Sequence, residues 1–403
     1  MKKIFLFTHS YPYARMGEAF IEVELKVAST LDIDLTIIPI YSSDFKKDIP
    51  SNVKINNKLN KLGFLRKSKV FFSMLVNPLF FGLFFRNIEI YRRPTNWYYA
   101  FKYLYGGLLI SDFLTSNISD FPEGSVLYSF WLNYTVLGFA LAKANNNHFK
   151  NCKFYSRVNG YDLYAEEIGI FMPYREKMLA SLDKVFPVSA MGAKLLSERY
   201  PDFSSIIEVS RLGTFPIQSI KEKKTGTDLS LISCSSVIPL KRVSLIFKSV
   251  NDFCIRNSHL RVKWIHIGDG SEMNNLKDSV DKEKADNLNV ELLGTRLNSD
   301  IIELLSTNVF DAFVNLSTRE GIPVTLMEAI SAGIPLIATD AGGNNEIVTK
   351  ETGCLIPMNF TDYEFSEAVK HCMNNEKLRE SALLFYQENF SALKNYKNFY
   401  EKL

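Results

Sequence analysis

Short apolar runs alternate with segments of helical spacing along the whole chain. Residues 3–8 and 33–40 are rich in β-branched and aromatic side chains, which is typical of strands. Between them, Phe20, Val23 and Val27 recur at the spacing of one helix face. A strand, a helix and a second strand in this order predict parallel pairing. The first half of the chain holds further strand candidates at residues 125–129, 153–158 and 184–188.

A charged, glycine-bearing stretch at residues 220–228 interrupts this pattern and is typical of a linker. A second alternating series follows, with strand candidates at residues 229–233, 262–268, 290–293, 312–315 and 336–339. Two such series predict an α/β protein with two Rossmann-like domains that face each other across a cleft. We expect the domains at residues 1–222 and 229–385, and a C-terminal helix at residues 386–403 that crosses back to the first domain. Ligands in such sheets bind beyond the carboxyl ends of the strands.

Composition narrows the class of protein. The 47 basic and 44 acidic residues leave a net charge of +3, which is too small to indicate a nucleic-acid partner. The five cysteines stand singly, which fits a reducing compartment and argues against a disulfide framework or a zinc site. The N-terminal apolar run is too short for a signal peptide, so it predicts a buried first strand and a cytoplasmic protein.

The longest apolar stretch, residues 70–85, is broken by an Asn-Pro pair and flanked by Lys67, Lys69 and Arg86. It is shorter than the roughly 18–20 residues that a membrane-spanning helix needs. One interpretation is a pair of core helices with an internal turn. The other is a segment in peripheral contact with the cytoplasmic face of the inner membrane, where its basic flanks meet lipid headgroups. The sequence leaves both open.

The stretch from residue 315 to residue 335 carries the most chemistry. A strand ends near residue 315, a loop holds Glu320, and Pro323 suits the first position of a helix. The free N–H groups near Val324 and Thr325 and the positive end of the helix dipole predict a phosphate site. Glu328, about one turn further along, can accept two hydrogen bonds from a ribose diol.

Glu320 and Glu328 do not suit a glycoside hydrolase pair. Their separation along the chain corresponds to roughly 12 Å even in a continuous helix. Hydrolytic carboxyl pairs stand about 5–9.5 Å apart. The two acids therefore serve different parts of one long ligand, or they are ordinary surface charges.

The pattern of Glu320 and Glu328, with Gly321 and Pro323 after the first acid, resembles the signature of the GT4 family of retaining glycosyltransferases, which have the GT-B fold. Further motifs resemble that family in the expected order: Gly17-Glu-Ala-Phe20, Arg157-Val-Asn-Gly-Tyr-Asp162, Ser210-Arg-Leu-Gly213, Val237-Ile-Pro-Leu-Lys241, His266-Ile-Gly-Asp-Gly270, Leu293-Gly294 and Asp340-Ala-Gly-Gly-Asn-Asn-Glu346.

The resemblance implies roles for single residues. Glu320 would contact hydroxyls of the donor sugar, Glu328 would hold the ribose, and Lys241 would pair with the diphosphate. The first domain would bind the acceptor and the second the nucleotide sugar. The implied catalytic residues are Glu320, Lys241 and Asn159, and the implied donor-binding residues are Gly17, Arg242, Gly268, Leu293, Gly321, Ile322, Pro323, Val324, Thr325 and Glu328.

Two departures from the family pattern limit what it implies. Asn159 stands where the family commonly has histidine, and an amide cannot act as an acid or base near neutral pH. Ser235 and Ser236 replace a common Gly-Arg pair, so Arg242 is the candidate for the missing guanidinium.

The only D-x-D, residues 32–34, precedes a strand instead of following one. We therefore expect a metal-independent enzyme without a cofactor.

The sequence as a whole predicts a retaining hexosyltransferase. Its donor would be a nucleoside-diphosphate sugar, and its acceptor a glycan or lipid-linked oligosaccharide in surface polysaccharide assembly. Two alternatives remain open: a nucleotide-sugar epimerase of the same fold, and a non-catalytic subunit that binds sugar nucleotides or glycans. The donor sugar, the base, the linkage and the oligomeric state are not predicted.

Overall fold

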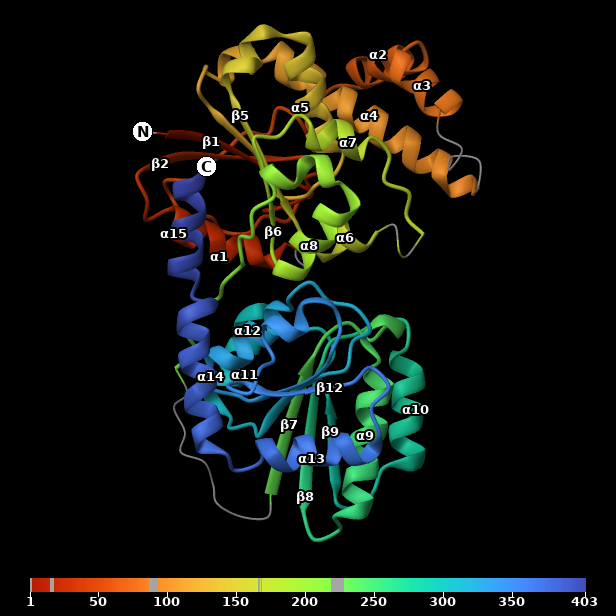
Figure 1. Cartoon of the computed structure of the whole chain (residues 1–403), viewed down its shortest axis with the longest axis vertical. Helices are drawn as coiled ribbons and strands as arrows, with labels where there is room; N and C mark the ends of the chain where they lie inside the picture. Colours follow the sequence, from red (N-terminus) through yellow and green to blue (C-terminus); the bar gives the residue numbers. More distant parts are fainter. Residues whose placement is uncertain (1, 15–17, 87–92, 166, 168, 219–227) are drawn as a thin grey trace. The chain divides into compact units, whose positions relative to one another are not determined.

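The chain folds as two compact units, which are described separately. The first comprises Met1–Ser210 and Tyr396–Leu403, and the second Arg211–Asn395. The structure, a computed structural model, describes residues 2–14, 18–86, 93–165, 167, 169–218 and 228–403 (Figure 1). Among these residues, none of the helices combines the length and the apolarity needed to cross a membrane.

The first unit is built on a six-stranded parallel sheet in the order β3-β2-β1-β4-β5-β6. The strands are β1 Lys2–Thr8, β2 Ile33–Pro39, β3 Lys54–Ile55, β4 Val126–Ser129, β5 Lys153–Val158 and β6 Lys184–Pro187. The helices are α1 Ala19–Ala28, α2 Phe64–Leu75, α3 Pro78–Arg86, α4 Pro94–Ser116, α5 Tyr134–Asn145, α6 Gly160–Tyr164, α7 Arg175–Leu179 and α8 Ala190–Arg199. The strand order reverses between β1 and β4, which makes the loops after these two strands the expected ligand site of this sheet.

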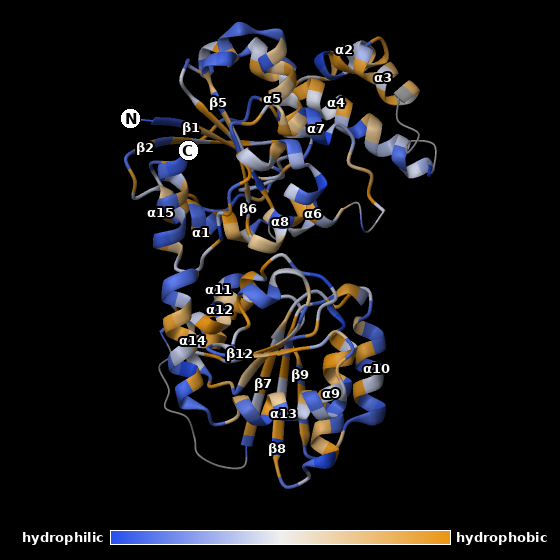
Figure 2. Cartoon of the chain, in the orientation of Figure 1, coloured by the Kyte–Doolittle hydropathy of each residue, from blue (hydrophilic) through white to orange (hydrophobic). Residues whose placement is uncertain are grey.

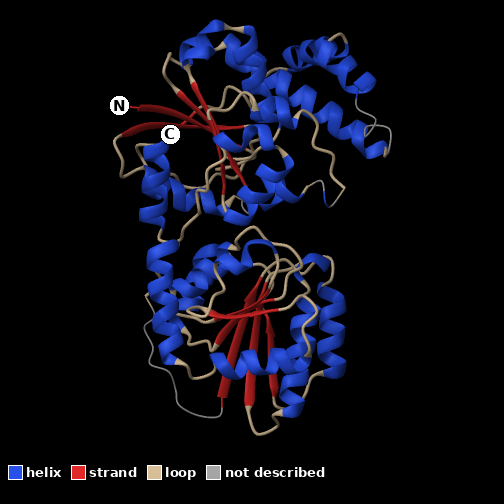
Figure 3. Cartoon of the chain, viewed as in Figure 1, coloured by secondary structure: helices blue, strands red, loops and turns tan. Residues whose placement is uncertain are grey.

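The second unit repeats this architecture with the sheet order β12-β11-β10-β7-β8-β9, again all parallel. The strands are β7 Asp228–Cys234, β8 Arg261–Ile267, β9 Leu288–Leu292, β10 Ala312–Asn315, β11 Leu336–Thr339 and β12 Gly353–Ile356. The helices are α9 Val243–Arg256, α10 Met273–Glu283, α11 Asn298–Thr307, α12 Val324–Ser331, α13 Asp362–Cys372 and α14 Glu376–Asn389. α9 packs against α10 and α13, and α12 against α14, so helices cover both faces of the sheet (Figure 3).

Two parallel-sheet, Rossmann-like units confirm the predicted fold class. Hydrophobic residues are frequent along the strands and in parts of the helices around them (Figure 2). Trp264 on β8 and Phe7 on β1 are both fully buried. Each sheet therefore has its own core.

The final helix, α15 Ala392–Lys402, contributes to both units, because the division between them falls at Tyr396. Its end packs on a buried ion pair of the first unit. The Nε atom of Arg157 lies 3.3 Å from a carboxylate oxygen of Glu24, and neither side chain is exposed. The guanidinium lies 3.9 Å from the ring centroid of Phe399, and the Tyr400 hydroxyl donates to Glu24 at 3.1 Å.

The apolar stretch at residues 70–85 forms two helices, α2 and α3, separated by a short turn, as the core-helix interpretation predicts. Only part of it is buried, however. Val70 and Met74 face the interior, whereas Phe72 and Val76 are exposed. The interpretation as a pair of core helices therefore explains the buried face of this segment but not its exposed apolar face.

Candidate active site

The strand order of the second unit brings two loops together. The order reverses between β10 and β7, which are adjacent. The loop after β7 carries Lys241, at the end of the short 3-10 helix Pro239–Lys241, and the loop after β10 carries Glu320. The two loops are joined by a hydrogen bond from the Thr318 N–H to the Leu240 carbonyl at 2.9 Å. The topology therefore explains why residues far apart in sequence share one site.

Lys241 and Glu320 form an ion pair. The Nζ of Lys241 lies 2.5 Å from Oε1 of Glu320, and the side chains are 21% and 9% exposed. The same carboxylate oxygen accepts a hydrogen bond from the Asn315 side-chain amide at 3.2 Å. A mostly buried carboxylate with two donors is held in one orientation, and the ammonium beside it stays partly open to an anion.

Helix α12 begins directly after this loop. Pro323, with φ −65° and ψ 128°, is the N-cap and not the first helical residue, so the helix begins one position later than expected, at Val324. The first N–H groups, those of Val324 and Thr325, have no carbonyl one turn earlier within the helix. They offer hydrogen bonds to an anion at the positive end of the helix dipole. Ile322 just before the cap is buried.

Glu328 lies one turn into α12 and is 4% exposed. The side-chain amide of Asn298, at the start of α11, donates to its Oε1 at 2.7 Å. Burial raises the pKa of Glu328 to about 7, and the hydrogen bond from Asn298 opposes that rise. Its carboxyl group is therefore part protonated and part ionised at neutral pH.

Two glycines allow the loops of this edge to touch. Gly268, after β8, has φ +142°, and a Cβ there would lie 1.8 Å from the Ser235 carbonyl oxygen. Its N–H donates to the Gly294 carbonyl at 2.9 Å, and the Leu293 N–H donates to the His266 carbonyl at the same distance. Gly343, after β11, would place a Cβ 1.7 Å from the carbonyl oxygen of Gly321. These close approaches fix the backbone around the Lys241–Glu320 pair.

Arg242 has a different set of contacts from the one expected for a phosphate ligand. It is the N-cap of α9 with φ 49°, and its guanidinium donates to the carbonyls of Leu316 at 2.5 Å and Met358 at 3.2 Å. These bonds tie the loop after β10 to the loop after β12. The Nη2 atom is buried without a hydrogen-bond partner in the described part of the chain.

In the first unit, the loops at the reversal point enclose Glu18. Its carboxylate accepts hydrogen bonds from three consecutive backbone N–H groups, those of His9 at 3.0 Å, Ser10 at 2.9 Å and Tyr11 at 2.8 Å. The indole N–H of Trp131, after β4, donates to the same group at 2.7 Å. Gly17, the preceding residue and a predicted donor ligand, lies outside the described residues. Glu18 thus fastens the loop after β1 to the loop after β4.

Asn159 also belongs to the first unit and caps helix α6. Its side-chain amide donates to the Phe130 carbonyl at 3.1 Å, and its N–H donates to the Asp162 carboxylate at 3.3 Å. A catalytic role for Asn159 stays a prediction. The observed contacts position the start of α6 beside the loop after β4.

The histidines near these loops are held neutral by burial. Burial lowers the pKa of His266 to about 4, and its Nδ1 lies 2.8 Å from the Ser233 hydroxyl. Burial also lowers the pKa of His9, although the charge of Glu18 raises it. His9 packs against Tyr41 with the two rings tilted and 4.7 Å between their centroids. Neither side chain supplies a charged imidazolium at neutral pH.

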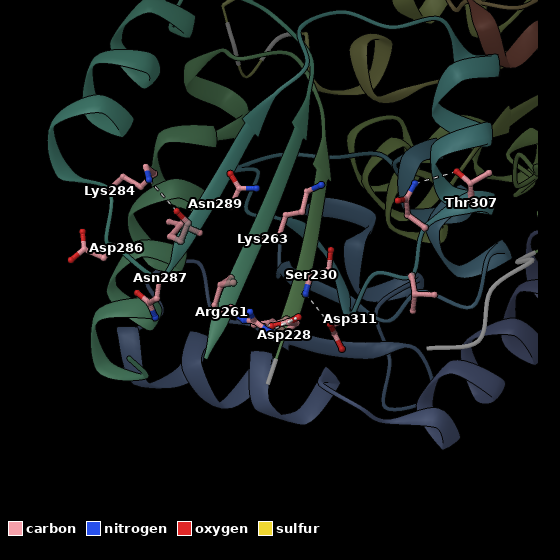
Figure 4. A pocket seen from close by; sticks show the side chains of 15 residues that line it. Asp228, Ser230, Arg261, Lys263, Lys284, Asp286, Asn287, Asn289, Thr307 and Asp311 are labelled. Atoms are coloured by element: carbon pink, nitrogen blue, oxygen red, sulfur yellow. Dashed lines mark hydrogen bonds and ion pairs between the residues drawn. The ribbon is translucent and has the colours of Figure 1, made fainter. Parts of the chain in front are cut away.

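A hollow of about 750 Å³ lies at the other end of the second sheet, at the amino-terminal ends of β7, β8 and β9 (Figure 4). Two of its three basic side chains are paired with carboxylates, and the third, Lys284, donates to the Leu288 carbonyl at 3.2 Å. Arg261 donates to both carboxylate oxygens of Asp228, at 2.7 and 3.2 Å, and Lys263 pairs with Glu291 at 2.7 Å. Because these charges are compensated within the protein, we place the nucleotide site at the opposite edge. In the described ranges, no three His, Cys, Asp or Glu side chains gather as a metal site requires.

Part of the chain is similar to a known protein family. Residues 215–382, most of the second unit, match the family of glycosyl transferases group 1. The UDP-Gal:alpha-D-GlcNAc-diphosphoundecaprenol alpha-1,3-galactosyltransferase of Escherichia coli is 37% identical over 100 residues, 25% of each chain. The UDP-N-acetylglucosamine–peptide N-acetylglucosaminyltransferase GtfA subunit of Streptococcus agalactiae is 26% identical over 200 residues, 48% of this chain and 37% of that protein. The matches thus span well under half the length of these curated relatives.

The fold agrees over the whole chain with solved structures. TarM of S. aureus, in complex with fondaparinux, alpha-GlcNAc-glycerol and UDP, superposes with a TM-score of 0.67 at 13% identity, covering 100% of this chain and 99% of that one. The chain therefore shares its fold with this structure, and most of its second unit matches the group 1 glycosyl transferases. The loops after β7 and β10 lie within the matched residues.

The structure brings together most of the residues predicted for the donor site. The pair Lys241 and Glu320 lies at the reversal point of the second sheet, with Gly321 and the start of α12 beside it. Sequence reasoning missed the partners of the two acids, Asn315 and Asn298. Asn315 could have been found, because it ends the strand that precedes Glu320. Asn298 comes from a separate helix, and nothing in its local sequence indicates the contact.

Proposed function

We propose that the protein is a retaining, metal-independent hexosyltransferase. It would move a hexose-type sugar from a nucleoside diphosphate to a glycan or lipid-linked glycan during surface polysaccharide assembly. The observation that carries this proposal is the Lys241–Glu320 pair directly before the free N–H groups of α12. A cation, a sugar-binding carboxylate and a phosphate-binding helix start are thereby held on one sheet edge.

The chemistry follows from the charges of these groups. In the reaction, the bond between the anomeric carbon and the diphosphate oxygen breaks, and the acceptor oxygen forms the new bond on the same face of the sugar. The proton of the acceptor hydroxyl passes to the departing phosphate. Lys241 would leave Glu320 for the diphosphate, where the negative charge grows in the transition state. The released Glu320 carboxylate would accept hydrogen bonds from the sugar hydroxyls.

Metal independence is supported by where the acidic residues lie. The only D-x-D includes Asp34, which lies at the amino end of strand β2. There Asp34 pairs with Lys54 at 2.7 Å. The diphosphate charge would instead be met by Lys241 and the start of α12. We expect full turnover in excess EDTA. Activity that disappears with EDTA and returns with manganese or magnesium would contradict this.

A donor screen tests the proposed function. Purified protein is heated with uridine and guanosine diphosphate sugars, and a ligand at 100 times its dissociation constant should stabilise the fold by about 2.7 kcal/mol. The selected donor is then incubated with candidate acceptors, and the anomeric configuration of the product is read by NMR. Donor consumption to an isomer without acceptor would identify an epimerase. Binding without any turnover would identify a binding subunit.

We also propose that helices α2 and α3 contact an anionic membrane surface. Their exposed apolar side chains include Phe64, Leu65 and Phe72, and the exposed Lys69 lies on the same helix. Aromatic and aliphatic groups would insert at the headgroup boundary while the lysines meet anionic lipid. Sedimentation with vesicles tests this. Binding should require anionic lipid and weaken at high salt, and equal recovery in every supernatant would remove the proposal.

A further inference from the structure

A second cavity lies entirely within the first unit. It has a volume of about 320 Å³ and is bounded by the chain that leaves β2, by α2, by α4 and by the start of α5. Tyr41 follows β2, so the cavity opens at the carboxyl edge of this sheet, where ligands of parallel sheets bind. Its volume is at the lower end of the roughly 300–1,000 Å³ of ligand cavities, enough for a headgroup.

The charge of this cavity distinguishes it from the hollow at the amino ends of the second sheet. Its lining includes two lysines, Lys67 from α2 and Lys102 from α4, and no aspartate or glutamate. Both lysines are half-buried, and neither has a carboxylate within ion-pair distance among the residues described. The Lys102 charge also contributes to lowering the pKa of His9, which follows β1. The cavity therefore offers two uncompensated cations.

Aromatic rings and aliphatic side chains form most of the rest of its wall. A Cβ at Gly106 of α4 would lie 2.5 Å from the ring of Tyr134. A glycine at this position therefore leaves room for that ring in the cavity wall. The hydroxyl of Tyr134 lies 3.4 Å from that of Tyr41. The Oδ1 of Asn60, another lining residue, is buried without a hydrogen-bond donor in the described part of the chain. A ligand hydroxyl would satisfy that oxygen.

The apolar surface of α2 begins at the edge of the cavity. Tyr105, which lines the cavity, makes an edge-on contact with Phe71 of α2, with 6.4 Å between ring centroids. Phe71 in turn contacts Phe72, and both are exposed. An apolar tail attached to a head in the cavity would therefore pass over these rings.

We propose that this cavity binds the phosphate-bearing head of a lipid-linked acceptor. Lys67 and Lys102 pair with the phosphate oxygens, Asn60 accepts from a sugar hydroxyl, and the lipid tail lies over Phe71 and Phe72. The inference rests on the proposed transferase function and names the acceptor class and its binding residues. Neither lysine transfers a proton in this scheme; both position the acceptor.

Farnesyl diphosphate is a suitable probe, because it carries the diphosphate and a short prenyl tail without a sugar. Calorimetry is performed on the full chain without vesicles and with saturating nucleotide, which blocks the donor site. The proposal expects farnesyl diphosphate to bind, and farnesol and inorganic diphosphate to bind at least tenfold more weakly. Lys67→Gln and Lys102→Gln should each lower the affinity about tenfold or more, as expected for a hydrogen bond to a charged group.

Lys69→Gln is the matched control, because Lys69 lies on the same helix but is exposed and does not line the cavity. It should leave the affinity unchanged. Equal binding of inorganic diphosphate would overturn the lipid part of the proposal, and unchanged affinity in the Lys67 and Lys102 variants would overturn the cavity itself. Nucleotide binding, measured separately on the same variants, should be unaffected. If the wild-type protein bound no nucleotide, that result would count against the transferase function and not against the cavity.

Discussion

At the scale of single residues, the chemistry of the second unit depends on pairs that were not visible in the sequence. Glu320, Lys241 and Glu328 were singled out by position and by resemblance. That Lys241 lies 2.5 Å from Glu320 depends on the reversal of strand order, which places the two loops side by side. Local patterns predict which residues carry charge, but contacts between distant loops follow only from the topology.

Changing both members of that pair should show that they act together. Lys241→Ala should lower kcat by roughly 10²–10³-fold, because the ammonium stabilises charge that develops on the leaving diphosphate. Glu320→Gln should abolish measurable transfer and leave the fold intact. In thermal unfolding, the loss of stability in the double variant should be smaller than the sum of the losses in the single variants, since the side chains share one contact. Steady-state kinetics and thermal unfolding measure these effects.

Lys248→Ala, which removes an exposed lysine of α9, is the control and should retain wild-type kinetics. A Lys241 variant that changes only KM would mean that this residue holds the donor without acting on the leaving group. Turnover of Glu320→Gln within a factor of two of wild type would remove Glu320 from the site.

The raised pKa of Glu328 predicts a pH-dependent nucleotide affinity. Burial raises the pKa of the Glu328 carboxyl group to about 7, and the ribose diol would bind the ionised carboxylate. Affinity should therefore fall as pH drops below about 7, by up to about tenfold per unit, and level off above it. In the absence of ligand the sign is opposite: the folded state binds this proton more tightly than the unfolded state, so stability decreases as pH rises through the range between the two pKa values.

Calorimetric titration of the selected nucleotide between about pH 6 and pH 8 measures this dependence. Glu328→Gln should bind more weakly and should lose the dependence on pH. A slope that persists in the variant would assign the titration to another group.

At the scale of elements, the hydrophobic pattern predicted most of the strands and missed β3 and β12. The strands expected from residue 3 to residue 339 are present as β1, β2, β4–β6 and β7–β11. β3 has only two residues, too few to show a period. β12 has four residues, as many as β10 and β11, but it begins with Gly353, and glycine is depleted in strands. The chain after β3 forms the helices α2, α3 and α4. Which faces of α2 and α3 are buried depends on α4, which the local pattern does not show.

The loop after β1 should depend on Glu18. Each carboxylate oxygen of Glu18 accepts two of the four N–H hydrogen bonds, so replacing this residue by glutamine puts an NH₂ group against two donors and removes two of these bonds. Since a bond to a charged group is worth roughly 1.5–3 kcal/mol, Glu18→Gln should lower the free energy of unfolding by about 2–3 kcal/mol.

Denaturant unfolding measures the effect of Glu18→Gln. Glu22→Gln on the same helix is the control, because its side chain is 39% exposed and pairs with exposed Lys26. It should change stability by less than about 0.5 kcal/mol. Equal stability of the two variants would mean that the loop holds its shape without Glu18.

At the scale of the whole molecule, the buried Arg157–Glu24 pair joins α1 and β5 to the end of α15. Arg157→Met should destabilise the protein by about 3–5 kcal/mol, because it leaves the Glu24 carboxylate buried without its cation. Adding Glu24→Leu should restore part of that loss, since no buried charge then remains. Chemical denaturation of the single and double variants measures both effects. A double variant less stable than Arg157→Met would show that the pair acts through its other contacts, including the bond to the Ser210 carbonyl.

The two-unit architecture follows from the alternation of strands and helices, and this part of the fold was predictable. The sequence also predicts a C-terminal helix that crosses back to the first domain, but it does not predict the contacts that the end of α15 makes there, because these depend on rings and charges separated by most of the chain. Phe399 meets Tyr128 and Phe186, with ring centroids 5.1 and 5.2 Å away, yet its own sequence neighbourhood shows only an amphipathic helix.

The membership of Tyr396–Leu403 in the first unit also sets an order for biosynthesis. A ribosome makes the six strands of that unit early, but the rings of Phe399 and Tyr400, which belong to its core, emerge after the entire second unit. During translation the core of the first unit therefore stays incomplete, and Arg157 and Glu24 lack their contacts with Phe399 and Tyr400 until the end of the chain has been made. Chaperones or proteases that recognise unfinished surfaces have that interval in which to act, and a premature stop codon late in the gene would damage the half of the protein that was made first.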